Sequence, residues 1–310
     1  MKKLFFTLSL FFICSLGFSQ QIPRFNPDTI RTIHIDSAVN ITSTRLTVET
    51  FIDEILRDTS FYEAFRNMKK YNYTAENQIF TYDKKNQVMG KIYRRILHNN
   101  KGAEKMQYLA KQDSGKVFKR NGKYELYTIE MFDYLFMNAY KADASSPGLS
   151  AKGGNASYKD KLKTLIFSPG RPVNGIPFIS NKTQIFTANM RQYYDYAFHR
   201  GTYLDSIPVY RFKVTEKPGL TNWTKDGIMI KELTTIFDMR NFQILGRYVD
   251  MKYSNLAFSF DVQMNIELGY FGDDQTLLPT KVNYQGNWDV PLKKAERASF
   301  LVFHKGYKEK

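Results

Sequence analysis

Residues 256–268 read LAFSFDVQMNIEL, and their pattern sets the architecture. Every even position from Leu256 to Leu268 is apolar, and every odd position except Ala257 is polar or charged. Successive side chains of a strand point to opposite faces, so this alternation gives one apolar and one polar face. A strand of this length spans roughly 43 Å at about 3.3 Å per residue, and typical strands have only about five or six residues. The stretch therefore predicts a long strand of a large sheet.

Two further segments, 207–215 and 280–290, repeat the alternation. Turn-forming clusters separate the expected strands, and Asn121-Gly122 between two apolar pairs predicts a type I′ hairpin. Short connections favour antiparallel neighbours. The expected fold class is α+β, mainly antiparallel β: a strongly curved half-barrel sheet with a few short helices covering its concave face.

Three segments have the spacing of helices rather than strands. One begins near Thr47 and carries an apolar stripe at i, i+3, i+4 and i+7. Ser60 and Glu63 fit a capping box and predict the start of a second helix. A third covers residues 128–140 and is apolar almost all round, so we expect it to be buried.

The N-terminus has the three parts of a secretory signal peptide. Lys2 and Lys3 form the charged region, residues 4–16 are apolar, and small residues at 17 and 19 fit a cleavage site. The apolar stretch is too short to favour a membrane-spanning anchor. We therefore expect an exported protein whose signal peptide is residues 1–19, periplasmic or outer-membrane-associated in a gram-negative bacterium.

The rest of the chain is expected to form one curved-sheet domain over residues 46–310. An extended leader, 20–45, precedes it, and the Ser-, Gly- and Ala-rich stretch 141–157 is predicted to be a flexible insertion. The one cysteine, Cys14, leaves with the signal peptide. The mature chain is then expected to have no disulfide and no thiol nucleophile.

The chain is basic, with a formal net charge of +15 that falls to +13 once Lys2 and Lys3 are removed. An exported protein with this charge is expected to meet anionic lipid head groups or acidic polysaccharides, and peripheral contact with the outer membrane fits the same charge. The basic residues are scattered, which is typical of a solvated surface. We expect no nucleic-acid partner.

Sequence motifs of catalysis and cofactor binding are missing: no HExxH, GxSxG, GxGxxG, EF-hand loop or CxxC occurs. Asp261 and Glu267 lie on one strand face about 20 Å apart, too far for a glycosidase pair, and we expect both to be solvated. Asp195 and His199 make too weak a pair to predict a metal site. The chain is thus expected to be non-enzymatic, with no cofactor and no metal.

The order of elements resembles the incomplete β-barrel of the outer-membrane lipoprotein-carrier family. Four segments carry the likeness: 207–214 (IPVYRFKV), 227–231 (GIMIK), 242–253 and 278–282 (LPTKV). It covers residues 46–310 as a layout and 207–303 with motif content. The resemblance implies a curved sheet whose concave apolar face is covered by helices and holds acyl chains. The insertion 141–157 departs from a minimal carrier, so the family's transfer role is not carried over.

The leading hypothesis is a non-enzymatic envelope protein that binds or carries a lipid or lipoprotein acyl chain in an apolar half-barrel. If helix 128–140 moves, the apolar face can receive an acyl chain, with about 0.8 kcal/mol of favourable binding free energy for each CH₂ that is buried. If the helix does not move, the helices close the apolar face permanently, and this face is only hydrophobic core. The candidate ligand-binding residues are Phe258, Phe260, Val262, Met264, Tyr284, Trp288, Phe132 and Phe136.

Three alternatives stay open. Long alternating strands also fit an outer-membrane β-barrel. Trp223, Trp288 and exposed lysines could serve a surface adhesion or polysaccharide-binding protein, whose partner would be an anionic envelope polymer. An enzyme acting on an envelope polymer would need two titratable groups converging in a cleft.

Overall fold

The structure is a computed structural model, and it describes ten segments of the chain. These are residues 33–35, 46–99, 105–137, 164, 166–173, 182–221, 224, 227–254, 259–289 and 294–309. The predicted signal peptide, most of the 20–45 leader, the 141–157 insertion and Phe258 lie outside the described residues. Within them, no helix has both the length and the apolar character needed to cross a bilayer.

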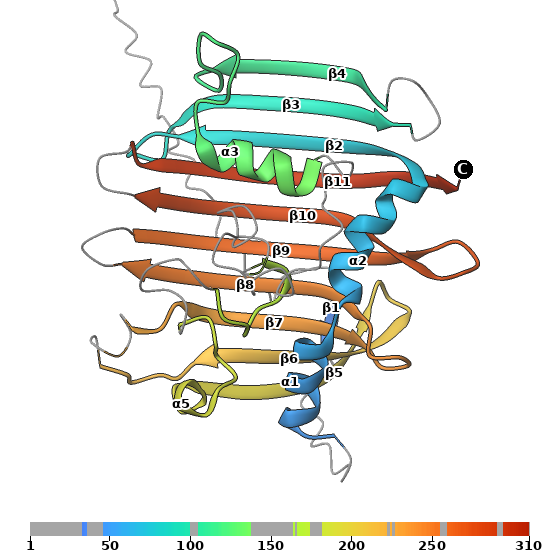
Figure 1. Cartoon of the computed structure of the whole chain (residues 1–310), viewed down its shortest axis with the longest axis vertical. Helices are drawn as coiled ribbons and strands as arrows, with labels where there is room; N and C mark the ends of the chain where they lie inside the picture. Colours follow the sequence, from blue (N-terminus) through green and yellow to red (C-terminus); the bar gives the residue numbers. More distant parts are fainter. Residues whose placement is uncertain are drawn as a thin grey trace, which may run out of the picture.

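One open antiparallel sheet of eleven strands organises the described chain (Figure 1), in the order β1-β5-β6-β7-β8-β9-β10-β11-β2-β3-β4. The strands are β1 Ile33–Ile35, β2 Tyr71–Tyr82, β3 Val88–His98, β4 Met106–Gly115, β5 Tyr194–Tyr203, β6 Ile207–Glu216, β7 Ile230–Asp238, β8 Ile244–Ser254, β9 Ser259–Phe271, β10 Thr276–Asp289 and β11 Glu296–Glu309. The edge strands β1 and β4 do not pair with each other. The expected fold class is confirmed.

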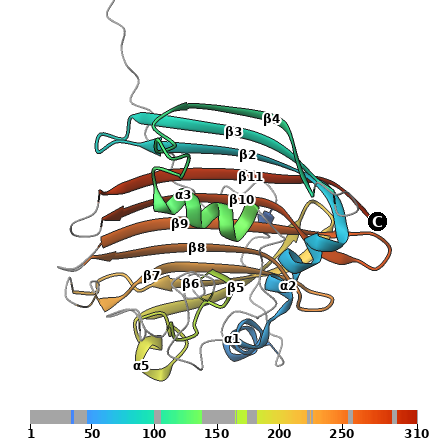
Figure 2. The ribbon, with the colours of Figure 1, turned by 45° about the horizontal axis from the view of Figure 1, so that its top comes forward.

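The helical elements are short. They are α1 Val48–Arg57, α2 Ser60–Asn67, η2 Met68–Lys70, α3 Tyr127–Phe132, the π-helical turn η3 Asp133–Met137, and α5 Ala188–Arg191. Helices α1, α2 and α3 lie in front of the same face of the sheet, and the turned view in Figure 2 shows the sheet's curvature beside them. Helix α2 packs over β10 and β8, and α3 packs on β11.

The long alternating stretch forms β9, as predicted, and continues past Leu268 to Phe271. Its neighbours are in register so that apolar positions meet: Met264 lies opposite Val249 of β8 and Tyr284 of β10. The segment 207–215 becomes β6, and most of 280–290 falls in β10. The alternation therefore fixes which face of each strand is buried.

The last strand of the chain joins the first large meander. Strand β11 pairs with β2, with Phe300 opposite Ile79, so the hairpins β2–β3–β4 extend the run of strands from β5 to β11. Segments that are more than two hundred residues apart in sequence thus share one hydrogen-bonded ladder.

The two faces of the sheet differ in chemistry. The covered face, under the helices, holds the apolar side chains of β9 (Phe260, Val262, Met264 and Ile266), all buried. The opposite face holds Gln263, Asn265 and Glu267 of the same strand and the residues in register with them. The covered face is the hydrophobic core of the described chain.

The first two helices begin differently from the sequence prediction. The Ser60–Glu63 capping box is wrong, because the Asp58 carboxylate caps α2: Oδ1 accepts from the Ser60 amide at 3.0 Å and Oδ2 from the Phe61 amide at 3.3 Å. The capping box instead occurs at α1, where Thr47 and Thr50 bond reciprocally. A carboxylate near a helix N-terminus is also favoured by the helix dipole.

The Asn121-Gly122 hairpin forms, but not with a type I′ turn. The Lys119 carbonyl accepts from the Gly122 amide at 2.9 Å, the Lys119 amide donates to Lys123, and only Gly122 has a positive φ, 76°. A type I′ turn needs a positive φ at both central residues. This loop is therefore a three-residue connection closed by a glycine in the left-handed region, and Phe118 still pairs with Tyr124.

The predicted helix 128–140 begins one residue earlier, at Tyr127, and changes to a π-helical turn at Asp133. Its buried side chains are Ile129, Met131, Phe132, Phe136 and Met137, which confirms that this segment is buried. Its predicted last turn, 138–140, falls outside the described residues.

Polar side chains on the opposite face are more buried than expected. Glu267 is 5% exposed, so the expectation that it is solvated is wrong. Its carboxylate accepts from Lys281 at 3.2 Å and from the Asn265 amide at 2.8 Å. Asp261 is partly buried and pairs with Lys252 at 3.4 Å. Cross-strand pairing of this kind holds polar side chains against the sheet.

Candidate functional site

Seven of the eight predicted ligand-binding residues come together on the covered face. Strand β9 supplies Phe260, Val262 and Met264, and its neighbour β10 supplies Tyr284 and Trp288. Helix α3 and the η3 turn lie over this face and direct Phe132 and Phe136 toward the sheet. All but the half-buried Trp288 are at most 7% exposed. The eighth, Phe258, is not among the described residues.

The five aromatic residues of this set belong to a series of side chains joined by ring contacts and, between Trp288 and Tyr284, by a hydrogen bond; we call this series the aromatic cluster. Its members are Phe260, Trp288, Tyr284, Phe300, Phe132, Phe136, Phe167 and Phe61. The tightest contact stacks Phe132 of α3 on Phe300 of β11, with ring centroids 4.1 Å apart. Trp288 packs on Phe260 and donates from Nε1 to the Tyr284 hydroxyl at 2.8 Å. The cluster joins the sheet to the elements that cover it.

The α3–η3 segment is fastened to the sheet at its N-terminus. The Glu296 carboxylate of β11 accepts from the amides of Tyr127 and Thr128, both at 2.8 Å, and from the Thr128 hydroxyl. Because the first amides of a helix lack intrahelical partners, an acidic side chain there both caps and orients it.

An ion pair holds the middle of the segment, at Asp133. Arg94 of β3, 3% exposed, has Nη1 3.0 Å from the Asp133 carboxylate and 2.8 Å from the Tyr124 hydroxyl. Nearby, the Asn77 amide donates to the Met137 sulfur at 2.9 Å. The segment therefore meets the sheet through polar contacts at its N-terminus, at Asp133 and at Met137, with the rings of Phe132 and Phe136 on either side of Asp133.

A second buried arginine lies near the centre of the sheet. Arg247 of β8 is 2% exposed, with its guanidinium 4.4 Å from the centre of the Phe61 ring. Its Nη1 donates to the Phe167 carbonyl at 2.9 Å, whereas Nε and Nη2 have no hydrogen-bond acceptor among the described residues. Burial lowers the pKa of Arg247 to about 10, and the group is still a cation at neutral pH.

Two buried histidines lie at the other end of the covered face. His98 stacks on Tyr73 with centroids 4.3 Å apart, and the His304 ring meets Tyr73 edge-on. Burial lowers the pKa of His98 to about 4. Burial, and then the charge on His98, lower the pKa of His304 to about 3. Both rings are thus neutral in the folded protein at ordinary pH.

Arg247 and Arg94 each interrupt an alternation of apolar residues along their strands. Arg247 is in phase with Leu245, Val249 and Met251, and Arg94 is in phase with Ile92 and Ile96. A charge in phase with buried positions is the sign that could have identified them, because charges are rarely buried without a partner.

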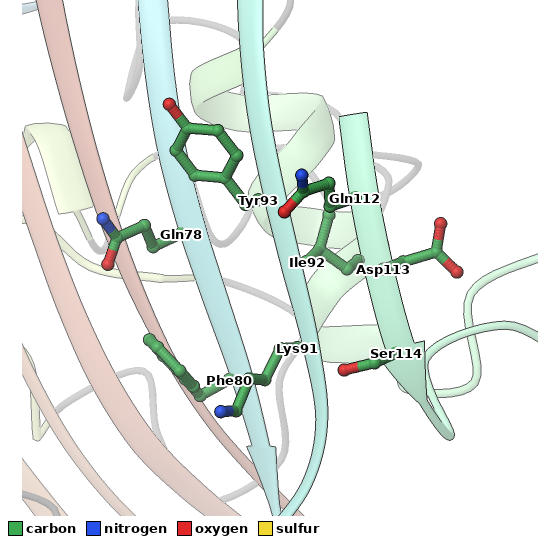
Figure 3. Close-up of a pocket in the computed structure, with 8 residues that line it drawn as sticks. All are labelled: Gln78, Phe80, Lys91, Ile92, Tyr93, Gln112, Asp113 and Ser114. Carbon is green, nitrogen blue, oxygen red and sulfur yellow. The ribbon is translucent and has the colours of Figure 1, made fainter. Parts of the chain in front are cut away.

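A hollow also occurs on the opposite face, between β2, β3 and β4. Its volume is about 370 Å³, and its lining, drawn in Figure 3, combines polar side chains such as Gln78, Lys91 and Gln112 with the rings of Phe80 and Tyr93. None of the predicted ligand-binding residues lines it. The described residues contain no group of three His, Cys, Asp or Glu side chains that could hold a metal ion. Trp223, the other tryptophan proposed for sugar stacking, lies outside them.

Comparisons with known proteins add little to this geometry. No family model matches the chain, and no curated protein matches its sequence. The chain is similar to the crystal structure of a DUF1329 family protein from Desulfovibrio piger, at 12% identity over 85% of this chain and 93% of the other, with a TM-score of 0.23. A likeness this distant carries no argument about fold or function, and the lipoprotein-carrier resemblance stays a prediction.

Proposed function

We propose that the protein is a non-enzymatic, exported binding protein of the cell envelope that holds an acyl chain of a lipid or lipoprotein. The chain would lie against the covered face, between the sheet and the α3–η3 segment. The observation that carries this proposal is the aromatic cluster. It is a continuous set of mostly buried aromatic side chains, and both the sheet and the α3–η3 segment contribute predicted ligand-binding residues to it.

The way in which α3–η3 is attached supports a ligand that replaces it. The segment is only 11 residues long, and few polar contacts attach it to the sheet: Glu296 caps its N-terminus, and Arg94 pairs with Asp133 in its middle. π-Helical turns are rare and often occur at functional sites. An acyl chain taking the place of Phe132 on Phe300 would gain about 0.8 kcal/mol per buried CH₂ and would offset the lost ring contacts.

Export and charge support the same proposal. The N-terminal 19 residues fit a signal peptide, and the chain without them has a formal charge of +13. A basic protein of the envelope is attracted to anionic lipid surfaces, where an acyl ligand would be taken up or delivered. A lipid or lipoprotein is therefore the proposed partner, with peripheral contact at the outer membrane.

Photocrosslinking tests the location of the ligand. The mature chain, residues 20–310, is incubated with a fatty acid that carries a diazirine in its tail, irradiated, digested and mapped by mass spectrometry. We expect labels on peptides that contain Phe132, Phe136 or Phe260, and competition by unlabelled fatty acid.

The opposite face provides the internal control for this experiment. Phe80 and Tyr93 line the hollow in Figure 3, on the side of the sheet away from the helices. Labelling confined to peptides with these two residues, or labelling that unlabelled fatty acid does not reduce, would contradict the proposal.

A further inference from the structure

Arg247 is a buried cation of the covered face with two N–H groups that have no hydrogen-bond acceptor among the described residues. The two N–H groups without an acceptor, Nε and Nη2, form one edge of the guanidinium, whereas Nη1 bonds to Phe167. That edge carries two parallel N–H bonds, the arrangement that binds two oxygens of a carboxylate or phosphate. A buried cation with an unused bidentate edge is costly, because the desolvated donors regain nothing within the protein.

Neighbouring charges do not fill this edge. Asp58 is the acidic group that acts on Arg247, and its two carboxylate oxygens accept from the amides of Ser60 and Phe61 at the start of α2. The other buried arginine of the covered face, Arg94, differs: its Nη2 also has no acceptor among the described residues, but the carboxylate of Asp133 lies 3.0 Å from its Nη1. Among the described residues, the covered face therefore contains one buried guanidinium that is paired with a carboxylate and one, that of Arg247, that is uncompensated.

The aromatic cluster ends at the uncompensated guanidinium of Arg247. Phe61 lies under the Arg247 guanidinium and contacts Phe167, and Phe167 contacts Phe136 of η3. The apolar path thus leads from β9 and β10, past α3–η3, to a buried positive charge. This is the arrangement that suits a molecule with an apolar tail and an anionic head.

We propose that the Nε and Nη2 groups of Arg247 bind the anionic head group, a carboxylate or a phosphate, of a single-chain amphiphile whose tail lies along the aromatic cluster. This inference rests on the proposed acyl-binding function and names the class of ligand. The head group enters where Phe167 now covers Arg247, so that segment moves while the sheet does not.

The test compares three ligands of one chain length: dodecanoate, dodecyl phosphate and dodecanol. Each is titrated into the delipidated mature chain by calorimetry at pH 7.5, below its critical micelle concentration. We expect at least one anionic ligand to bind at least about tenfold more tightly than dodecanol, since hydrogen bonds to charged groups are worth more than neutral ones. The tighter of the two identifies the head group as carboxylate or phosphate.

Two variants assign the preference to Arg247. In Arg247→Met the anionic preference should fall to about twofold or less, while binding of dodecanol persists, because replacing an uncompensated buried charge by an apolar side chain is often tolerated. In the matched control Arg211→Met, which removes a buried arginine from the opposite face of the sheet, the preference should persist.

The outcomes separate the two proposals. Equal binding of all three ligands by the wild-type chain would overturn the role of Arg247 and leave the acyl-binding function standing, and this comparison needs no variant to fold. An anionic preference that Arg247→Met retains would also overturn that role. Failure of all three ligands to bind would overturn the proposed function itself.

Discussion

We expect the two buried histidines, His98 and His304, to make the stability of the folded protein sensitive to mild acid. His98 and His304 lie in the covered face beside Tyr73, and their pKa values are lowered to about 4 and about 3 from an ordinary value of 6.5. The unfolded chain binds protons at both rings below pH 6.5, and the folded chain does not until a much lower pH. The free energy of unfolding is therefore highest above pH 6.5 and falls as the pH decreases toward the folded values.

The size of the effect follows from these shifts. At pH 5 an exposed histidine with a pKa of 6.5 gains about 2 kcal/mol by protonation, and the buried rings gain almost nothing. The two histidines together then lower the free energy of unfolding by about 4 kcal/mol between pH 8 and pH 5. That is a large fraction of the roughly 5–15 kcal/mol of a typical domain.

Urea unfolding at pH 8, 7, 6 and 5 measures this dependence. The variants His98→Gln and His304→Gln should each remove about half of it, whatever their effect on stability at pH 8. His199 on β5 serves as the control, because it is partly exposed on the opposite face, and His199→Gln should leave the dependence as it is. Keeping the pH at 5 or above avoids most carboxylate titration.

A flat profile would refute the reasoning. A wild-type loss below about 1 kcal/mol between pH 8 and pH 5 would mean that the histidines are hydrated or protonated in the folded protein. The same conclusion would follow if His199→Gln reduced the dependence as much as the two buried substitutions.

Two further predictions concern the cap of α2 and the centre of the aromatic cluster. Asp58→Ala should lower the free energy of unfolding by about 1 kcal/mol, measured by urea unfolding, whereas Thr59→Ala should cost little because its side chain makes no capping bond; equal losses would rule out Asp58 as the cap. Phe300→Ala should cost about 3–5 kcal/mol by leaving a cavity under Phe132. Tyr108→Ala, at a side chain 49% exposed on edge strand β4, should stay within about 0.5 kcal/mol of wild type, and a similar loss in both variants would speak against the packing around Phe300.

The strands could be predicted because their pattern is local. In β9 an apolar residue recurs at every second position, and this alone determines which side chains are buried. It also predicted that Phe260 and Met264 share a face with Tyr284 and Trp288, since neighbouring strands keep their apolar faces together.

Pairing between distant strands could not be predicted in this way. The alternation in β11 and in β2 says that each is a strand, but nothing in either segment says that Phe300 will lie opposite Ile79. That choice depends on the whole sheet. The position of α3 over β11, and with it the contact between Phe132 and Phe300, follows from the same pairing.

Single polar residues were the other source of error. The side chain that caps α2 is Asp58, two residues before the predicted cap Ser60, because its carboxylate accepts from two backbone amides. Glu267 is buried by its pairing with Lys281, a contact between strands that the sequence does not reveal. Arg247 was overlooked because its strand was judged by its apolar residues alone.

The most direct test of the central claim is the ligand content of the native protein. The mature chain is purified from envelopes of its own host without detergent, and its organic extract is analysed by mass spectrometry alongside intact native mass spectrometry of the protein. The proposed function predicts about one acyl-chain molecule retained per protein in the detergent-free preparation. A preparation that carries no lipid, and takes up none when it is offered, would mean that the covered face is only the core of the fold.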